Sequence, residues 1–159
     1  MPIEVPSVRI LIVDDDKAIC DFMQSLLEKD GFIVKTLSDP TLVEDEVRQG
    51  DYHVLILDLM MPKMDGIEVL KKIRTIDSDI AVVIFTAHPN LDSAVASMKL
   101  DAVDYIKKPF NVEEFREVLA RVERLLDVVD RVESSPSISS LYKIAVALDS
   151  KIHDLFGNN

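Results

Sequence analysis

The segment Val54–Asp58 places a carboxylate directly after four apolar residues, and this arrangement limits the folds open to the chain. A short, unbroken apolar run is typical of a strand that is buried on both faces of a sheet. Pro62, Asp65 and Gly66 follow and predict a turn and the start of a helix. Asp58 is therefore predicted to stand at the carboxyl end of a buried strand, which is the edge where open α/β sheets bind ligands.

Three further apolar runs also end in polar side chains. They are Val8–Val13 before Asp14, Asp15 and Asp16; Ile80–Phe85 before Thr86; and Ala102–Ile106 before Lys107 and Lys108. Any one of these polar residues, taken alone, would be an ordinary loop residue. Because the carboxyl ends of parallel strands meet at one edge of a sheet, we expect the acids, the hydroxyl and the lysine to converge.

The segments between these runs have the spacing of amphipathic helices. The predicted helices begin near Asp16, Pro40, Gly66, Asn90 and Asn111, and a short edge strand is predicted at Phe32–Leu37. Apolar residues that follow the helical spacing include Phe22 in the first helix and Leu91 in the fourth. Asp16 and Asp65 are expected to cap helices. Five strand–helix units in strict alternation predict a parallel sheet covered by helices on both faces.

Composition bounds the classes of protein that remain. The chain has 159 residues and a net charge of −11, which argues against broad binding to nucleic acid or anionic membranes. No apolar run approaches the roughly 20 residues of a membrane span, and no secretory signal is visible. Cys20 is the single cysteine, which fits a reducing cytoplasm. We expect a lead-in over 1–7, one domain over 8–132, and a linker and helical extension over 133–159.

About residues 7–130 resemble the receiver domain of bacterial two-component response regulators. The phosphorylated aspartate of that family matches Asp58, and its acidic pair for Mg²⁺ matches Asp14 and Asp15. Met60 matches the position whose backbone carbonyl completes the metal site. The resemblance implies a flavodoxin-like fold, a doubly wound five-stranded parallel sheet with strand order 2-1-3-4-5.

Other positions of the family are also filled. The phosphoryl-contacting residues match Thr86, Ala87 and Lys108, and Tyr105 matches the switch aromatic. Pro109 matches a proline that typically follows a cis peptide bond. The resemblance implies a phosphoryl acceptor that is not an enzyme and that works in the cytoplasm. It also implies Mg²⁺ or Mn²⁺ as cofactor and a histidine kinase or phosphotransfer protein as partner.

The residue types suit this chemistry. Asp58 is a carboxylate that can take a phosphoryl group as an acyl phosphate. A hard divalent cation relieves the repulsion between clustered acids, and Lys108 adds positive charge where oxygen charge accumulates. Thr86 can donate a hydrogen bond to the new phosphoryl group and so bias a loop between two states. Met60 and His88 lie where the family tunes hydrolysis, and we expect a long-lived phosphate.

The last part of the chain allows several interpretations. Apolar residues of the fifth predicted helix recur at 3-4-3-4-3 steps from Val112 to Val129. Residues of about 131–157 weakly resemble the end of a Cro/repressor-type helix-turn-helix domain. The first two helices of that domain are missing, so packing on the fifth helix or on a second subunit is favoured over DNA binding. We therefore expect a homodimer through this helix and tail.

Two alternatives to a phospho-acceptor remain at this point. One is a transcription regulator whose tail contacts DNA directly. The other is a haloacid-dehalogenase-type phosphatase, because Asp14–Asp16 contains Asp-x-Asp after a strand, and Thr86 and Lys108 have counterparts in that family. That family places its nucleophile on the first strand, so Asp58 fits it less well.

Overall fold

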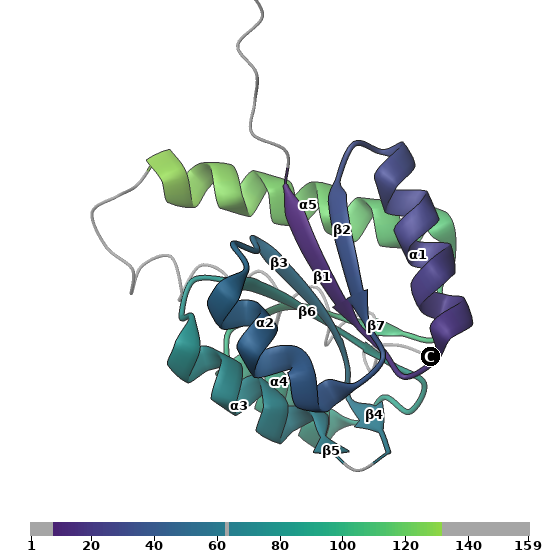
Figure 1. The fold of residues 1–159 in the computed structure, drawn as a ribbon, viewed down its shortest axis with the longest axis vertical. Coiled ribbons are helices and arrows are strands. Elements are labelled where there is room, and N and C mark those ends of the chain that lie inside the picture. The colour runs from purple at the N-terminus through teal and green to yellow at the C-terminus, as the bar shows by residue number, and fades with distance from the viewer. Residues whose placement is uncertain (1–7, 63, 132–159) are drawn as a thin grey trace, which may run out of the picture.

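The computed structural model describes residues 8–62 and 64–131. One parallel sheet has the strand order β2-β1-β3-β6-β7 (Figure 1). Its strands are β1 (Arg9–Val13), β2 (Ile33–Leu37), β3 (Val54–Asp58), β6 (Ala81–Thr86) and β7 (Ala102–Lys107). This order confirms the predicted 2-1-3-4-5 arrangement, because β4 (Met60–Met61) and β5 (Met64–Asp65) form a separate hairpin, so that β6 and β7 are the fourth and fifth strands of the main sheet. The predicted edge position of β2 is also confirmed.

Helices cover both faces of the sheet. They are α1 (Lys17–Lys29), a 3-10 turn at Pro40–Leu42, α2 (Val43–Gln49), α3 (Gly66–Ile76), α4 (Leu91–Lys99) and α5 (Val112–Arg131). Figure 1 shows α1 and α5 on one face and α2, α3 and α4 on the other. Each face has its own hydrophobic cluster, and the strand residues alternate between the two clusters. No helix within the described ranges is both long and apolar enough to cross a membrane.

Short polar side chains start the helices as predicted. The Asp16 carboxylate accepts hydrogen bonds from the amides of Ala18 and Ile19, and the Asp65 carboxylate accepts one from Ile67. Asn90, which was predicted only to lie near the start of its helix, caps α4 in the same way. These side chains satisfy amides that have no partner within the helix, so each fixes where its helix begins.

A small antiparallel hairpin was not predicted. It pairs β4 (Met60–Met61) with β5 (Met64–Asp65) directly after β3. Sequence alone indicates only a turn there, because each strand is two residues long and carries no period. The hairpin returns the chain so that the Gly66 amide bonds to the Leu59 carbonyl. A Cβ on Gly66 would lie 2.5 Å from Leu59 Cα, so this close return requires glycine.

Two of the apolar residues on the helical stripes are not in the core. Phe22 is 53% exposed and Leu91 is 51% exposed. Phe22 lies at the border of the buried stripe of α1, where its ring centroid is 6.3 Å from that of Phe110. Leu91 is the first residue of α4, and Ala94 and Met98 take the buried positions of that helix. A helical period identifies a stripe, but the width of the covered strip depends on the neighbouring elements.

The predicted packing seam of α5 faces the sheet. Phe115, Leu119 and Val122 are buried, and Leu125 is only 4% exposed. Leu126 still packs against the same cluster. The seam positions beyond Leu126, including Val129, lie outside the described side chains. The possible helix-turn-helix remnant and the extension over 133–159 lie outside the described residues as well.

Candidate functional site

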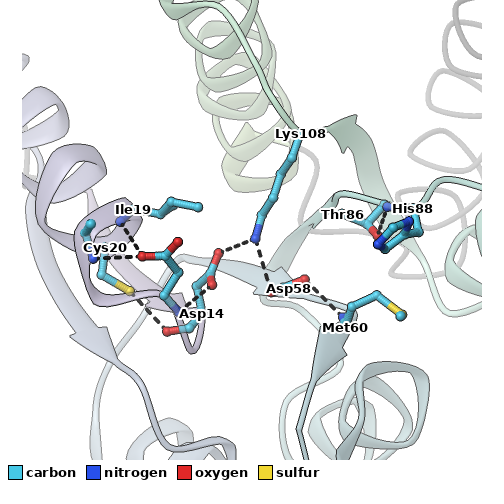
Figure 2. Close-up of polar contacts among 10 residues, drawn as sticks. Asp14, Ile19, Cys20, Asp58, Met60, Thr86, His88 and Lys108 are labelled. Atoms are coloured by element: carbon cyan, nitrogen blue, oxygen red, sulfur yellow. Dashed lines mark hydrogen bonds and ion pairs between the residues drawn. The ribbon is translucent and has the colours of Figure 1, made fainter.

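Three carboxylates, those of Asp14, Asp15 and Asp58, meet at the carboxyl edge of the sheet, and Figure 2 shows Asp14 and Asp58 on either side of Lys108. Asp14 directly follows β1 and is 1% exposed, while Asp58 ends β3 and is 3% exposed. Asp15 is exposed to solvent. One oxygen from each of the three lies within 4.8 Å of the others. The structure thus brings together three of the acids that the strand ends predict.

Lys108 places a positive charge between the two buried acids. Its Nζ atom donates to Asp14 Oδ2 at 2.7 Å and to Asp58 Oδ2 at 3.1 Å. The side chain is 14% exposed, so little water screens these contacts. The Lys108 amide donates to the Thr86 carbonyl at 2.7 Å, which ties the residue to the end of β6. The bond between Lys108 and Pro109 is cis, as the resemblance implied.

Burial and neighbouring charges shift the pKa of two of these groups. Burial raises the pKa of the Asp58 carboxyl above 3.8, and the charge of Asp14 adds to the rise, although the Met60 amide and Lys108 oppose it. Burial lowers the pKa of Lys108, but its hydrogen bonds to Asp14 and Asp58 and their charges outweigh burial and raise it overall. An isolated buried carboxylate would be costly, so Asp58 depends on the cation beside it.

The donor set fits a hard divalent cation. Three carboxylates within mutual reach supply oxygen ligands, which Mg²⁺ and Mn²⁺ prefer. Asp15 is exposed and has room to bind a hydrated ion, whereas Asp14 is already hydrogen-bonded to the Asp16 amide at 2.9 Å and to Lys108. Met60 lies beside these acids, and its amide donates to Asp58 Oδ1 at 3.0 Å.

The loop after β6 supplies the predicted hydroxyl. Thr86 is 1% exposed, and its Oγ1 atom accepts a hydrogen bond from the His88 amide at 3.1 Å. Ala87 and His88 are both exposed. Figure 2 shows Thr86 and His88 on the side of Asp58 opposite to Asp14. The hydroxyl is thus held by its own loop and lies at the same sheet edge as the acids.

Tyr105 is fully buried on β7 and contacts the start of α4. Its hydroxyl lies 2.5 Å from Ser93 Oγ and accepts from the Asn90 amide at 3.4 Å. The predicted switch aromatic therefore lies inside the fold, between strand and helix. Ser93 was not singled out from sequence, because a serine one turn into a helix has no distinguishing pattern.

Two contacts of the site also escape sequence analysis. The Cys20 thiol donates to the Asp14 carbonyl at 3.3 Å, and burial, followed by the charge of Asp14, raises the pKa of this thiol to about 11. The ring of Phe85 lies 4.9 Å from Lys108 Nζ. From sequence, a phenylalanine in a strand is predicted to be a core residue, and only the position of Phe85 directly before Thr86 indicates that it lies near the site.

A family model described as "Response regulator receiver domain" matches residues 10–120. The response regulator MprA of Mycobacterium bovis BCG is 37% identical over 120 residues, covering 76% of this chain and 51% of that protein. MprA of Mycobacterium sp. strain KMS is 34% identical over 136 residues, covering 84% and 58%. The chain therefore spans about half the length of these curated relatives.

Solved structures of receiver domains also resemble this chain. A response regulator receiver domain protein from Clostridium thermocellum superposes with a TM-score of 0.69 at 31% identity, covering 77% of this chain and 98% of that one. The signal receiver domain of a putative LuxO repressor protein from Vibrio parahaemolyticus gives a TM-score of 0.74 at 25% identity, covering 81% and 99%. With its fold, its acidic edge and its sequence in agreement, the chain belongs to the response regulator receiver domain family of two-component signalling.

Proposed function

We propose that Asp58 accepts a phosphoryl group from the phosphohistidine of a partner histidine kinase or phosphotransfer protein. A single observation carries the proposal: a buried carboxylate at the end of β3 shares one ammonium, that of Lys108, with the neighbouring Asp14. Attack by an Asp58 oxygen forms a new P–O bond as the P–N bond of the donor breaks. The electron pair of the broken bond leaves with the imidazole.

The surrounding residues would neutralise charge during this transfer. Phosphoryl transfer depends mainly on positioning and electrostatic stabilisation, and the chain places Lys108 and three carboxylates there. Asp14, Asp15, Asp58 and the Met60 carbonyl would hold a divalent cation, which would supply positive charge to offset the negative charge that builds up during the transfer. Lys108, which already donates to Asp58, would also donate to the phosphoryl oxygens as negative charge accumulates on them.

The output would be conformational. Thr86 can exchange its hydrogen bond from the His88 amide for one that it donates to a phosphoryl oxygen. Such a change would reach α4, because Tyr105 joins β7 to the first turn of that helix. The face made by α4, β7 and α5 would therefore differ between the two states. We propose that this surface, within a receiver module over 8–132, carries the signal.

The role proposed is that of a signalling acceptor, with no substrate turned over. Membership of the receiver family favours an acceptor over a haloacid-dehalogenase-type phosphatase, and the nucleophile stands on β3. The exposed Met60 side chain and His88, neither of them a carboxylate or amide that would hold an attacking water, support a long-lived acyl phosphate. The DNA-binding alternative concerns the tail, which lies outside the described residues.

The test is incubation of the full chain with acetyl phosphate and Mg²⁺, followed by intact-mass measurement. We expect the mass of one phosphoryl group on the wild-type chain and none on Asp58→Ala. The control is Asp51→Ala, which removes an exposed acid from the loop before β3. Equal labelling of Asp58→Ala and wild type would refute the assignment. Steady release of inorganic phosphate from a phosphate ester by Asp58→Asn would instead favour the phosphatase.

A further inference from the structure

We propose that Phe85 is a positioning residue for phosphoryl transfer, because the face of its ring holds the Lys108 ammonium beside Asp58. The inference rests on the proposed function and deepens it. Lys108 Nζ lies 4.9 Å from the centroid of the Phe85 ring, within the range of a cation–π contact. The same nitrogen donates to Asp14 and Asp58, so the ammonium has two carboxylates and one aromatic ring as partners.

The Phe85 ring is itself held in place. Phe85 is 1% exposed, and the ring of Phe110 meets it edge-on with centroids 5.0 Å apart. Phe115 lies behind, with its centroid 5.0 Å from that of Phe110. These rings belong to β6, α5 and the loop between β7 and α5. The ring beneath Lys108 is thus part of the core cluster and has little freedom to turn away.

The ring has a role that neither carboxylate can take. During phosphoryl transfer the negative charge on Asp58 is redistributed to the phosphoryl oxygens, so the hydrogen bond from Lys108 to Asp58 must change. The ring face stays where it is and attracts the ammonium throughout. Because the Lys108 side chain is only 14% exposed, few water molecules can reach the ammonium and take the place of the Phe85 ring. Without the ring, the ammonium would be free to move toward Asp14, its closer partner at 2.7 Å.

The experiment replaces Phe85 in the full chain with 4-fluoro-, 3,5-difluoro- and 3,4,5-trifluorophenylalanine. Fluorine withdraws charge from the ring face while the shape of the ring changes little. We expect the rate of Asp58 phosphorylation by acetyl phosphate to fall stepwise with each fluorine. The total decrease should be about fivefold, which corresponds to about 1 kcal/mol. The matched control is the same series at Phe115, which should change the rate less than twofold.

A second measurement reports position without any reaction. The ε-methylene protons of Lys108 should show a ring-current shift in NMR spectra, and Phe85→Leu should remove it. Three results would each overturn the proposal. The phosphorylation rate could stay the same across the fluorine series at Phe85, or it could fall equally in the series at Phe115. The rate could also still fall with fluorine at Phe85 in the Lys108→Met variant. Failure of the unmodified chain to label at Asp58 would instead refute the proposed function, so the two failures are distinguishable.

Discussion

The hydroxyl of Tyr105 on β7 lies 2.5 Å from the hydroxyl of Ser93 in the first turn of α4. The tyrosine is fully buried, and the serine is half-buried. One side chain therefore ties the sheet to the start of the helix that the proposed switch would move.

Ser93→Ala should loosen the first turn of α4. Removal of the serine hydroxyl takes a partner from a buried tyrosine hydroxyl, at a cost of about 1–2 kcal/mol in the free energy of unfolding. Hydrogen exchange of the amides at the start of α4 should accelerate, while exchange in β3 should change much less. Ser78→Ala is the control, since only the backbone carbonyl of that exposed residue is used. Unchanged hydrogen exchange at the start of α4 would show that the contact between Ser93 and Tyr105 does not stabilise this turn.

Asp58→Asn should stabilise the chain at neutral pH when no divalent cation is present. The pKa of Asp58 is raised in the folded state above its ordinary 3.8, mainly by burial. The folded state therefore holds this proton more tightly, and the stability falls as pH rises from about 3.8 through the raised pKa. Removal of the charge should abolish that loss.

Urea denaturation of Asp58→Asn and wild type at several pH values measures this effect. The advantage of the variant should be largest above the raised pKa of Asp58 and should shrink as the pH falls toward 3.8. Asp51→Asn, at an exposed position, should show no comparable trend. A variant less stable than wild type at neutral pH would mean that the hydrogen bond to Lys108 outweighs burial.

Mg²⁺ should raise the melting temperature of the wild-type chain. A cation that binds the folded state alone stabilises it by mass action, by about 2.7 kcal/mol at a concentration one hundred times the Kd. Asp15→Ala should abolish most of the rise because it removes the solvent-exposed ligand. Asp16→Ala should lower the starting temperature through loss of the α1 cap and yet keep the rise. If Asp15→Ala keeps the full rise, the metal binds elsewhere.

Arg74→Met should cost roughly 3 kcal/mol or more of stability. The side chain is half-buried, and its guanidinium donates to backbone carbonyls in the segments that follow α3 and α4, which would lose these partners. The acceptors are the carbonyls of Leu100, Asp101, Ser78 and Ile80. Lys72→Met is the control, because the ion pair of Lys72 with Glu44 is exposed and should cost less than about 1 kcal/mol. Similar denaturation midpoints for the two variants would contradict this account.

The full chain should form a dimer that a chain ending at Glu133 does not. The sequence predicts an apolar stripe in the tail beyond the receiver fold, at Leu141, Ile144, Ala145, Leu148, Ile152, Leu155 and Phe156, and an apolar stripe of that size needs cover from water. Two copies packed about a twofold axis would bury it in a closed assembly. Light scattering on both chains, with and without acetyl phosphate, measures the mass. A full chain that remains monomeric at high concentration would exclude the dimer.

The sequence alone determined the sheet, its parallel strands and the edge at which the polar residues gather. Buried parallel strands are continuous apolar runs, so the residue that ends each run is visible without coordinates. Asp14, Asp58, Thr86 and Lys108 all end or follow such runs, and their convergence follows from the direction of the strands. The helix caps at Asp16 and Asp65 are equally local, because each bonds to amides two or three residues ahead.

The tertiary structure alone decided how side chains distant in sequence pair. Lys108 could have faced any of several acids, and only the packing of β7 beside β6 places it between Asp14 and Asp58, over Phe85. The exposure of Phe22 and the contact of Tyr105 with Ser93 likewise depend on how closely helices approach the sheet. The spacing of apolar residues shows which side of a helix or strand is apolar. Contacts between side chains depend on the distances between elements, which the sequence of one element alone does not determine.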